Sequence, residues 1–351
     1  MMTTGRCISR RDVFTVLAGT FVGAQWPRDL CAQVVAPKGL DRIDVHHHFQ
    51  APGSVGLRDW SAAIALDAMD RDGVAVGVGN VQGDPVLRAT IDPERRRAQV
   101  RGWNDFGAKV VASRPDRFGL FATLPLDDID GTLQEIDYAY TQLKADGCGI
   151  ATSYADKWVG DPTFEPVFQE LNRRSAIVFV HPTDAPCCVP AALTYEKPPI
   201  QGAWLEWPMN TARAIFSLIA NGSLRRYPRI RFIFSHGGGV MPLLVSRIEG
   251  EVELSTVGPD RFRAMFPNGI RSEFATLYFE GAQAFDPVNF DALTKLVPMS
   301  HILFGTDYNR LSIATAVSAL DGLKLPSEST YAIGRGNAET LFPRFKAALR
   351  R

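Results

Sequence analysis

Short apolar segments alternate with longer amphipathic segments along most of this chain, and this alternation constrains the fold more than any other feature. The apolar segments are rich in β-branched residues and predict eight strands, at residues 42–48, 73–81, 118–126, 148–154, 176–182, 230–238, 277–282 and 301–307. Most are apolar throughout their centres, as in parallel strands that are covered on both faces. The segments between them, such as 93–115, carry apolar residues at helical spacing. Because parallel strands need right-handed crossovers, eight such units predict a (β/α)8 barrel of the TIM type.

The length of 351 residues allows one barrel-sized domain, which we expect over residues 40–350. An open, doubly wound parallel sheet is the alternative. Such a sheet usually carries a glycine fingerprint for a nucleotide after an early strand, and the sequence has none there. The 38 basic and 38 acidic residues balance, so no net charge favours nucleic acid or an anionic membrane as a partner.

The first 35 residues have the three-part order of an export signal. Arg10 and Arg11, in "SRRDVF", precede an apolar run from Val13 to Ala24 that is too short to span a bilayer, and polar residues follow it. The arginine pair is similar to a twin-arginine signal. We therefore expect residues 1–35 to direct the protein to the periplasm or out of the cell. The alternative is a basic N-terminus before a short helix, in a cytoplasmic protein.

Good metal ligands stand at four of the predicted strand ends. In a (β/α)8 barrel, the carboxyl ends of the strands form the active-site face. The first predicted strand ends in His46-His47-His48 and the fifth in His181. The sixth ends in His236 and the eighth in Asp307. Because side chains alternate along a strand, His46 and His48 share one face, whereas His47 is expected to face the helices or a neighbouring loop.

This ligand set predicts a divalent metal at the barrel mouth. Nitrogen and oxygen ligands without a thiolate favour Zn²⁺, and they also suit Mn²⁺ or Fe²⁺. Three histidines and an aspartate leave a position for a water molecule, which the metal makes acidic. His301 comes at the start of the eighth strand, on the opposite face of the barrel, and we expect it to be structural or exposed. The glycines at 237–239 follow His236 and allow a substrate to approach the backbone closely.

Several motifs, in this order, resemble the amidohydrolase superfamily, and specifically its aminocarboxymuconate-semialdehyde decarboxylase-like branch. The resemblance runs from about Arg42 to Phe345. It is carried by His46-x-His48, "FVHP" at 179–182, "FSHGGGVMPLLVSRI" at 234–248, "LFGTDY" at 303–308 and "GNAETLF" at 336–342. Within the branch, the segments "ADGCGIATSYADKWVGDPTFEPVFQELNRR" and "HPTDAPCC" look most like decarboxylases of the 6-methylsalicylate type.

The resemblance assigns roles to individual residues. It implies that His46, His48, His181 and Asp307 are the metal ligands, and that His236 is a catalytic acid/base beside the metal. It also implies that Arg247 reaches into the site of a neighbouring subunit to bind a substrate carboxylate, which makes a homodimer the expected unit. The alternative for Arg247 is an arginine on a surface helix.

The chain also departs from the branch in three places. Asn309 stands where the branch usually has a proline after "GTDY". Some relatives carry a substrate-binding arginine in the first long helix, but here the first arginine of that segment is Arg71, at its end. The predicted fourth strand has no lysine for the carbamylated bridge of two-metal relatives, so we expect one metal. The loop at 183–208 is rich in proline and aromatic residues (Tyr195, Trp204, Trp207) and is either a wall of an aromatic pocket or inert surface.

Together these features predict a metal-dependent, non-oxidative decarboxylase of an aromatic or unsaturated carboxylic acid, such as a salicylate. The metal would bind the carboxylate and an adjacent hydroxyl, and His236 or Asp307 would protonate the ring carbon as CO₂ leaves. A hydrolase of a lactone or an amide uses the same ligands and is the first alternative. A non-catalytic metal-binding barrel is the second.

Overall fold

The strands form one eight-stranded parallel sheet that curls into a nearly closed barrel. The computed structural model describes residue 39 and residues 41–51, 59–81, 92–188, 202–251 and 258–348, so the predicted export signal lies outside the described residues. The sheet order is β1-β2-β3-β4-β7-β8-β9-β10. These strands are β1 (Arg42–Phe49), β2 (Val74–Val81), β3 (Phe118–Thr123), β4 (Gly147–Ala151), β7 (Ile177–His181), β8 (Arg231–Phe234), β9 (Tyr278–Glu280) and β10 (Ile302–Leu303). A small antiparallel ribbon, β5 (Ser153–Tyr154) and β6 (Lys157–Trp158), follows β4.

The two ends of the sheet are joined by backbone hydrogen bonds. The N–H of Val45 donates to the carbonyl of Phe304 at 3.0 Å, and the N–H of Asp307 donates to the carbonyl of His46 at 2.9 Å. An open sheet would leave these edges apart. The barrel prediction is therefore confirmed over the described strands, and the doubly wound alternative was wrong.

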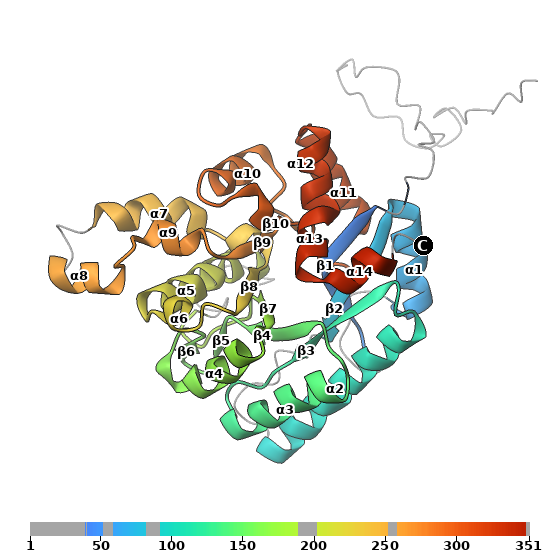
Figure 1. Cartoon of the computed structure of the whole chain (residues 1–351), viewed down its shortest axis with the longest axis horizontal. Coiled ribbons are helices and arrows are strands. Elements are labelled where there is room, and N and C mark those ends of the chain that lie inside the picture. Colours follow the sequence, from blue (N-terminus) through green and yellow to red (C-terminus); the bar gives the residue numbers. More distant parts are fainter. Residues whose placement is uncertain are drawn as a thin grey trace, which may run out of the picture.

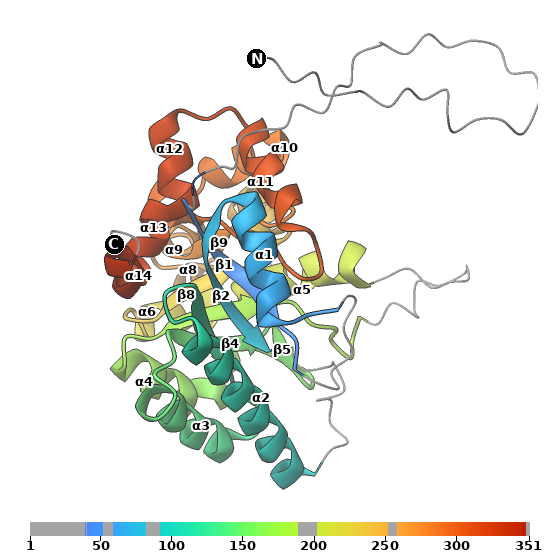
Figure 2. The ribbon, with the colours of Figure 1, turned by 90° about the vertical axis from the view of Figure 1, so that its right-hand side faces the viewer.

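Helices surround the strands on the outside, as Figures 1 and 2 show. In the first half of the chain they are α1 (Ala62–Asp72), α2 (Pro93–Ser113), α3 (Ile129–Thr141) and α4 (Glu165–Arg173). In the second half they are α5 (Glu206–Ala220), α6 (Ser223–Arg226), α7 (Met241–Gly250), α8 (Pro259–Met265), α9 (Ile270–Phe274), α10 (Pro287–Thr294), α11 (Ile313–Gly322), α12 (Ser327–Tyr331), α13 (Asn337–Leu341) and α14 (Pro343–Ala348). None of the helices in the described part of the chain has both the length and the apolar character needed to cross a bilayer.

Local sequence explains where the first helices begin and end. The Ser61 hydroxyl accepts a hydrogen bond from the N–H of Ile64 at the start of α1, and Gly73 ends that helix with a φ of 76°. The Asp92 carboxylate caps α2, whose first residue is Pro93. All eight residues of β2 are buried, as its continuous apolar sequence predicts for a strand that is covered on both faces.

The eighth strand is shorter than its sequence predicts. The segment 301–307 was expected to be extended throughout, but only Ile302–Leu303 forms a strand. Beyond it, the N–H and the hydroxyl of Thr306 both donate to the Asp44 carboxylate, at 3.0 and 2.6 Å, instead of to a strand carbonyl. Asp307 then has a φ of 56°, which turns the chain out of the sheet at the barrel mouth.

Candidate metal centre

The end of β1 places two of its three histidines at one point. The Nε2 atoms of His46 and His48 lie 3.1 Å apart, and both side chains are buried. His47 points the other way: its Nδ1 lies 3.0 Å from the Asp44 carboxylate, and its ring lies 4.8 Å from the Tyr308 ring. The predicted alternation of these three side chains is confirmed. His47 packs on neighbouring barrel segments instead of joining the cluster.

Two further strand ends complete a cluster of four possible ligands. The Oδ1 of Asp307 lies 2.9 Å from the Nε2 of His48 and 3.4 Å from the Nε2 of His46. The ring of His181, from β7, lies 5.1 Å from that of His46. One ligand atom from each of these four residues lies within 4.8 Å of every other, so the cluster has the dimensions of a metal site.

The chemistry of this cluster fits a divalent metal ion. Two imidazole nitrogens that bind one Zn²⁺ at 2.0–2.1 Å with tetrahedral geometry lie roughly 3.3 Å apart, close to the separation of the His46 and His48 nitrogens. The Nε2 of His181 is buried and has no hydrogen-bond partner among the described residues. A buried polar atom without a partner is costly, and a metal ion would remove that cost. Three neutral imidazoles and one carboxylate are a ligand set that Zn²⁺ and Mn²⁺ both accept.

Hydrogen bonds fix the orientation of two of the imidazoles. The Nδ1–H of His181 donates to the Pro182 carbonyl at 2.8 Å, and the Nδ1–H of His46 donates to the Glu280 carboxylate at 2.7 Å. In each case the Nε2 keeps a free lone pair and faces the cluster. These tautomers are the ones in which both histidines can bind a metal through Nε2.

Glu280 is a site residue that the sequence did not reveal. It lies at the end of β9, is fully buried, and also accepts hydrogen bonds from the N–H groups of His236 and Ala282 at 2.6 and 2.7 Å. Residue 305 is a glycine, which leaves room for the Glu280 carboxylate, because a Cβ at this position would lie only 1.9 Å from a Glu280 oxygen. The sequence feature that could have indicated Glu280 is that it is the one acidic residue in the apolar stretch "LYFEGA". A charged side chain in such a stretch is rarely buried without a partner.

His236 stands beside the cluster and faces the cavity above it. Its ring lies 5.0 Å from that of His46 and 6.0 Å from that of His181. Its Nδ1–H donates to the Ala282 carbonyl at 3.1 Å, which leaves the Nε2 free to exchange a proton. Its φ of 55° belongs to the turn that the glycines at 237–239 continue. His236 also belongs, with His46 and Glu280, to a second group of close ligand atoms.

Burial sets the protonation of the site. It lowers the pKa of His46 to about 4, the pKa of His181 well below its usual value, and the pKa of His236 as well. Burial alone would raise the pKa of Asp307, but the attraction of His46 and His48 lowers it overall. Burial raises the pKa of Glu280 to about 7. The cluster therefore offers neutral imidazoles at His46 and His181 and an ionised carboxylate at Asp307, the forms that bind metal.

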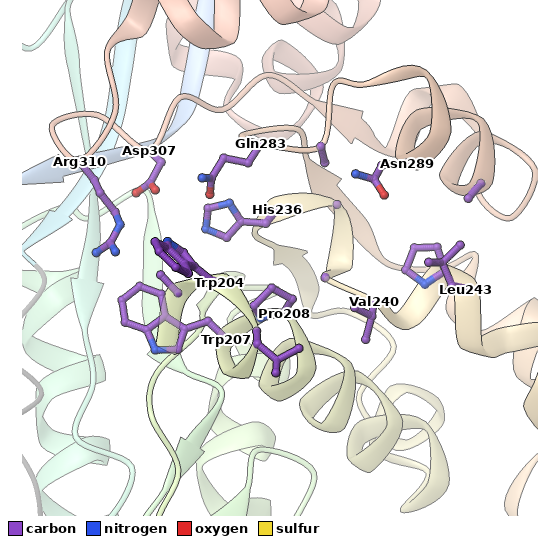
Figure 3. A pocket seen from close by; sticks show the side chains of 17 residues that line it. Trp204, Trp207, Pro208, His236, Val240, Leu243, Gln283, Asn289, Asp307 and Arg310 are labelled. Carbon is purple, nitrogen blue, oxygen red and sulfur yellow. The ribbon is translucent and has the colours of Figure 1, made fainter. Parts of the chain in front are cut away.

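A cavity of about 510 Å³ opens beside the cluster. This volume lies within the roughly 300–1,000 Å³ that is usual for small-molecule sites. Figure 3 shows Asp307, Gln283 and His236 side by side on one part of its wall, with Trp204 and Trp207 across from them. The two tryptophans confirm that the end of the predicted loop at 183–208 lines a pocket, whereas Tyr195 lies outside the described residues.

Two other residues of interest lie away from this cavity. Arg247 lies on α7 with 76% of its side chain exposed, 3.6 Å from the Glu251 carboxylate, and it does not line the cavity of its own chain. His301 lies just before β10, where its ring stacks 4.1 Å from that of Tyr278 and its Nδ1–H donates to the Leu277 carbonyl. His301 is thus a structural residue at the amino-terminal end of the strands, as the sequence predicts.

Comparison with known proteins places the chain in a family. The amidohydrolase family model matches residues 43–344. The 6-methylsalicylic acid decarboxylase of Penicillium expansum is 30% identical over 329 residues, which cover 88% of this chain and 98% of that protein. The 2-amino-3-carboxymuconate-6-semialdehyde decarboxylase of Dictyostelium discoideum is 27% identical over 254 residues, covering 71% and 67% of the two chains.

A solved structure supports the fold. The dihydroxybenzoic acid decarboxylase of Polaromonas sp. JS666, crystallised with manganese and the inhibitor 2-nitroresorcinol, superimposes with a TM-score of 0.73 at 22% identity and covers 87% of this chain and 97% of that one. The match of the family model across the barrel, together with a relative that is similar along nearly its whole length, shows that this chain belongs to the amidohydrolase family and confirms its resemblance to that family's decarboxylase branch.

Proposed function

We propose that this chain is a metal-dependent, non-oxidative decarboxylase of an aromatic carboxylic acid of the hydroxybenzoate or salicylate type. The observation that carries the proposal is the convergence of His46, His48, His181 and Asp307 beside His236 at the wall of one cavity. The Penicillium expansum and Polaromonas proteins described above are decarboxylases of such acids by name, and the first of them is similar to this chain over almost its whole length.

We further propose that the site holds one divalent metal ion, bound by His46, His48, His181 and Asp307. We propose Zn²⁺ ahead of Mn²⁺ as this ion. When bound, such an ion supplies Lewis acidity, which stabilises negative charge on the oxygens of a carboxylate and an adjacent hydroxyl. Metal analysis of protein purified without added metal decides between Zn²⁺ and the Mn²⁺ bound by the Polaromonas protein. Less than half an equivalent of any divalent metal, with no gain on reconstitution, contradicts this part of the proposal.

The protein's own side chains complete the chemistry. As the bond between the ring and the carboxylate breaks, its electron pair stays on the ring carbon, CO₂ leaves, and that carbon takes up a proton. The Nε2 of His236 faces the cavity and, after it takes up a proton from solvent, is positioned to deliver that proton to the ring carbon, with the ionised Asp307 carboxylate as the other group at the site that can relay a proton from solvent in the same way. Trp204 and Trp207 supply flat apolar surfaces against which an aromatic ring can pack.

Two experiments test the reaction type. Metal-loaded enzyme is incubated with a panel of hydroxybenzoates while CO₂ release and the phenol product are followed, and release from none of them contradicts the proposal. Reaction in ¹⁸O-labelled water separates decarboxylation from the hydrolase alternative. Decarboxylation puts no solvent oxygen into the organic product, whereas attack by a metal-bound water does.

A homodimer that shares residues between its sites is the proposed unit. Leu243 and Arg247 lie one turn apart on α7, both exposed, and Leu243 and the 72%-exposed Trp204 border the cavity. Large apolar side chains exposed next to a site often mark an interface. We propose that Arg247 binds a substrate carboxylate in the cavity of a second copy of this chain.

Subunit mixing tests this arrangement. In a dimer of His236→Ala and Arg247→Ala chains, one of the two sites is intact if Arg247 acts in the other subunit. Random mixing should then restore about a quarter of the wild-type activity from two variants that are inactive alone. No restoration, or a monomer by analytical ultracentrifugation, contradicts the proposal.

We also propose that residues 1–35 direct export through the twin-arginine route, on the strength of the arginine pair and the apolar run that follows it. Residues 1–40 fused to a reporter in a bacterial host test this. Export that persists when Arg10 and Arg11 are both changed to Lys contradicts the twin-arginine route, and a reporter that stays in the cytoplasm contradicts export.

A further inference from the structure

Gln283 shares an uncommon backbone conformation with two residues of the site. Among the described residues, seven other than glycine have a positive φ, and three of these seven line the cavity: His236 at 55°, Asp307 at 56° and Gln283 at 58°. Residues with a Cβ rarely adopt this conformation, and those that are held in it cluster at functional sites. His236 and Asp307 both act in the proposed reaction. The same conformation in the same cavity wall indicates a function for Gln283 as well.

Hydrogen bonds beside Gln283 fix its place next to His236. Gln283 follows β9, and the residue before it, Ala282, donates its N–H to the Glu280 carboxylate at 2.7 Å. The carbonyl of Ala282 accepts the Nδ1–H of His236 at 3.1 Å. This carbonyl belongs to the peptide unit that joins Ala282 to Gln283. The backbone of Gln283 therefore begins at the group that holds the His236 imidazole.

The side-chain amide of Gln283 is free to bind a ligand. The residue is exposed to the cavity, and Figure 3 shows its amide on the same part of the wall as the His236 ring and the Asp307 carboxylate. It forms no hydrogen bond with any group in the described part of the chain. The amide of Asn289, which also lines the cavity, donates to Asp286 instead. Gln283 thus offers the cavity an unused donor and an unused acceptor.

The position of Gln283 indicates which part of a substrate it meets. In the proposed reaction, the ring carbon that loses CO₂ takes up its proton from His236, so this carbon lies next to His236. One of its two neighbouring ring positions carries the hydroxyl that the metal binds together with the carboxylate. The metal does not hold the other neighbouring position. Because Gln283 extends from the peptide unit that holds His236, its amide can reach a substituent at this second position.

The chemistry of an amide indicates what that substituent is. A hydroxyl both donates and accepts a hydrogen bond, as the amide does, whereas a methyl group does neither and excludes the water that would otherwise bind the amide. A site that hydrogen-bonds a hydroxyl of its substrate strongly rejects the analogue without it, because a polar group of the site is then left unpaired. An uncharged amide therefore favours a hydroxyl over an alkyl group at this position.

We infer that Gln283 is a specificity-determining residue that hydrogen-bonds a second hydroxyl of the substrate, on the side of the reacting carboxylate away from the metal-bound hydroxyl. The inference rests on the proposed function for the position of the reacting carboxylate. The preferred substrate class is a salicylate with a hydroxyl group, instead of an alkyl group, at its 6-position. The Penicillium expansum relative, in contrast, is named for an acid with a methyl group at that position.

Binding of unreactive nitrophenols tests this inference without turnover. A nitro group has the shape of a carboxylate but cannot leave as CO₂. The inhibitor in the Polaromonas structure, 2-nitroresorcinol, has the second hydroxyl beside its nitro group, and 3-methyl-2-nitrophenol has a methyl group there. Their dissociation constants are measured by calorimetry on metal-loaded protein, and the ratio of the two constants is the hydroxyl preference. Differences in the acidity of the two ligands cancel when this ratio is compared between variants in one buffer.

Gln283→Met removes the hydrogen-bonding groups but keeps the length of the side chain. It should reduce the hydroxyl preference about tenfold, through weaker binding of 2-nitroresorcinol, as the loss of a hydrogen bond in a binding site requires. Its metal content and melting temperature should stay near those of the wild type. Gln283→Gly should reduce the preference by a similar factor without lowering the melting temperature, because glycine adopts a positive φ freely.

Lys324→Gly is the matched control for the change in the backbone. Lys324 also has a positive φ, of 52°, but it follows α11 and does not line the cavity. Its variant should keep the full hydroxyl preference. Melting temperature and metal content establish that each variant is folded and can hold the metal.

Three results would overturn the inference: no binding of either nitrophenol to the metal-loaded wild type, a hydroxyl preference that survives Gln283→Met, or an equal loss of both ligands in that variant. Loss of the preference in Lys324→Gly as well would assign it to a general change in the fold and also overturn the inference. A protein that shows the Gln283-dependent preference but releases CO₂ from no aromatic acid would contradict the proposed function alone.

Discussion

The Oε1 of Glu280 lies 2.7 Å from the Nδ1 of His46, with both side chains fully buried. The carboxylate accepts the Nδ1 proton and so keeps the Nε2 of His46 free to bind metal. Glu280→Gln can present an amide N–H to the same nitrogen and favour the wrong tautomer. We expect this variant to bind the metal about 10–100-fold more weakly while it stays folded. Competition with a fluorescent chelator measures the change.

Glu339→Gln is a suitable control for the Glu280 experiment. Glu339 is also a buried carboxylate, but it pairs with Arg335 on the C-terminal helices and contacts no histidine of the cluster. Its variant should keep wild-type metal affinity even if its melting temperature falls. Equal metal affinity in the Glu280 and Glu339 variants would show that Glu280 does not orient His46.

His181→Ala and His236→Ala should separate ligand binding from proton transfer. Loss of His181 removes a nitrogen from the cluster, so the metal content should fall and activity should fall with it. Loss of His236 should reduce turnover at least about 100-fold. It should leave the metal content near normal, because the four proposed metal ligands remain: His46, His48, His181 and Asp307. Elemental analysis and CO₂ release on the same preparations compare the two. Metal loss in His236→Ala would make His236 a ligand.

The sequence predicted the parts of the site that depend on strand alternation and strand ends. The positions of His46, His48 and His181 follow from a period of two residues and from the shared edge of parallel strands. The barrel itself follows from eight apolar segments with helical crossovers. Where the two ends of the sheet meet, Thr306 also donates hydrogen bonds to the Asp44 carboxylate, and no period in the sequence indicates these.

The parts that the sequence did not predict depend on contacts between distant segments. Glu280 is important because it meets His46, which lies 234 residues away in the chain. Arg310, which lines the same cavity, lies in a turn, where no periodicity fixes the direction of a side chain, and its guanidinium lies 4.7 Å from the centroid of the Trp207 ring. Arg247 remains a prediction, because its proposed role requires a second subunit.

Glu170 should make stability depend on acidic pH. Its carboxylate accepts hydrogen bonds from Arg173 at 2.7 Å and Arg174 at 2.6 Å, which lowers its pKa from 4.5 to about 2. The unfolded chain therefore binds a proton at higher pH than the folded chain does. The stabilisation should be complete above about pH 5 and decline as the pH falls from 4.5 towards 2.

Melting of the wild type and Glu170→Gln across this pH range tests the effect. Because Arg173 is largely exposed, we expect the free energies of unfolding of the wild type and of Glu170→Gln to differ by only about 0.5–1 kcal/mol at pH 7. It should shrink steadily below pH 4.5. A difference that stays constant from pH 7 to pH 3 would mean that the ion pairs contribute nothing and that the substitution acts through another contact.

Gly239 should tolerate no side chain, because the cavity wall is built against it. It has a φ of 61°, and a Cβ on it would lie 2.2 Å from the carbonyl oxygen of Pro208 in the first turn of α5. Both residues line the cavity, so Gly239→Ala must move the glycine turn away from α5 or strain the backbone. We expect a loss of roughly 1–3 kcal/mol in the free energy of unfolding, together with weaker ligand binding.

Gly250→Ala, at the end of α7 with no atom within 4 Å of its added Cβ, is the matched control and should be neutral or stabilise by up to about 1 kcal/mol. Denaturant unfolding and analogue binding of the two variants compare them directly. Equal stability and equal binding would show that the turn at 237–239 adapts without cost and does not shape the site.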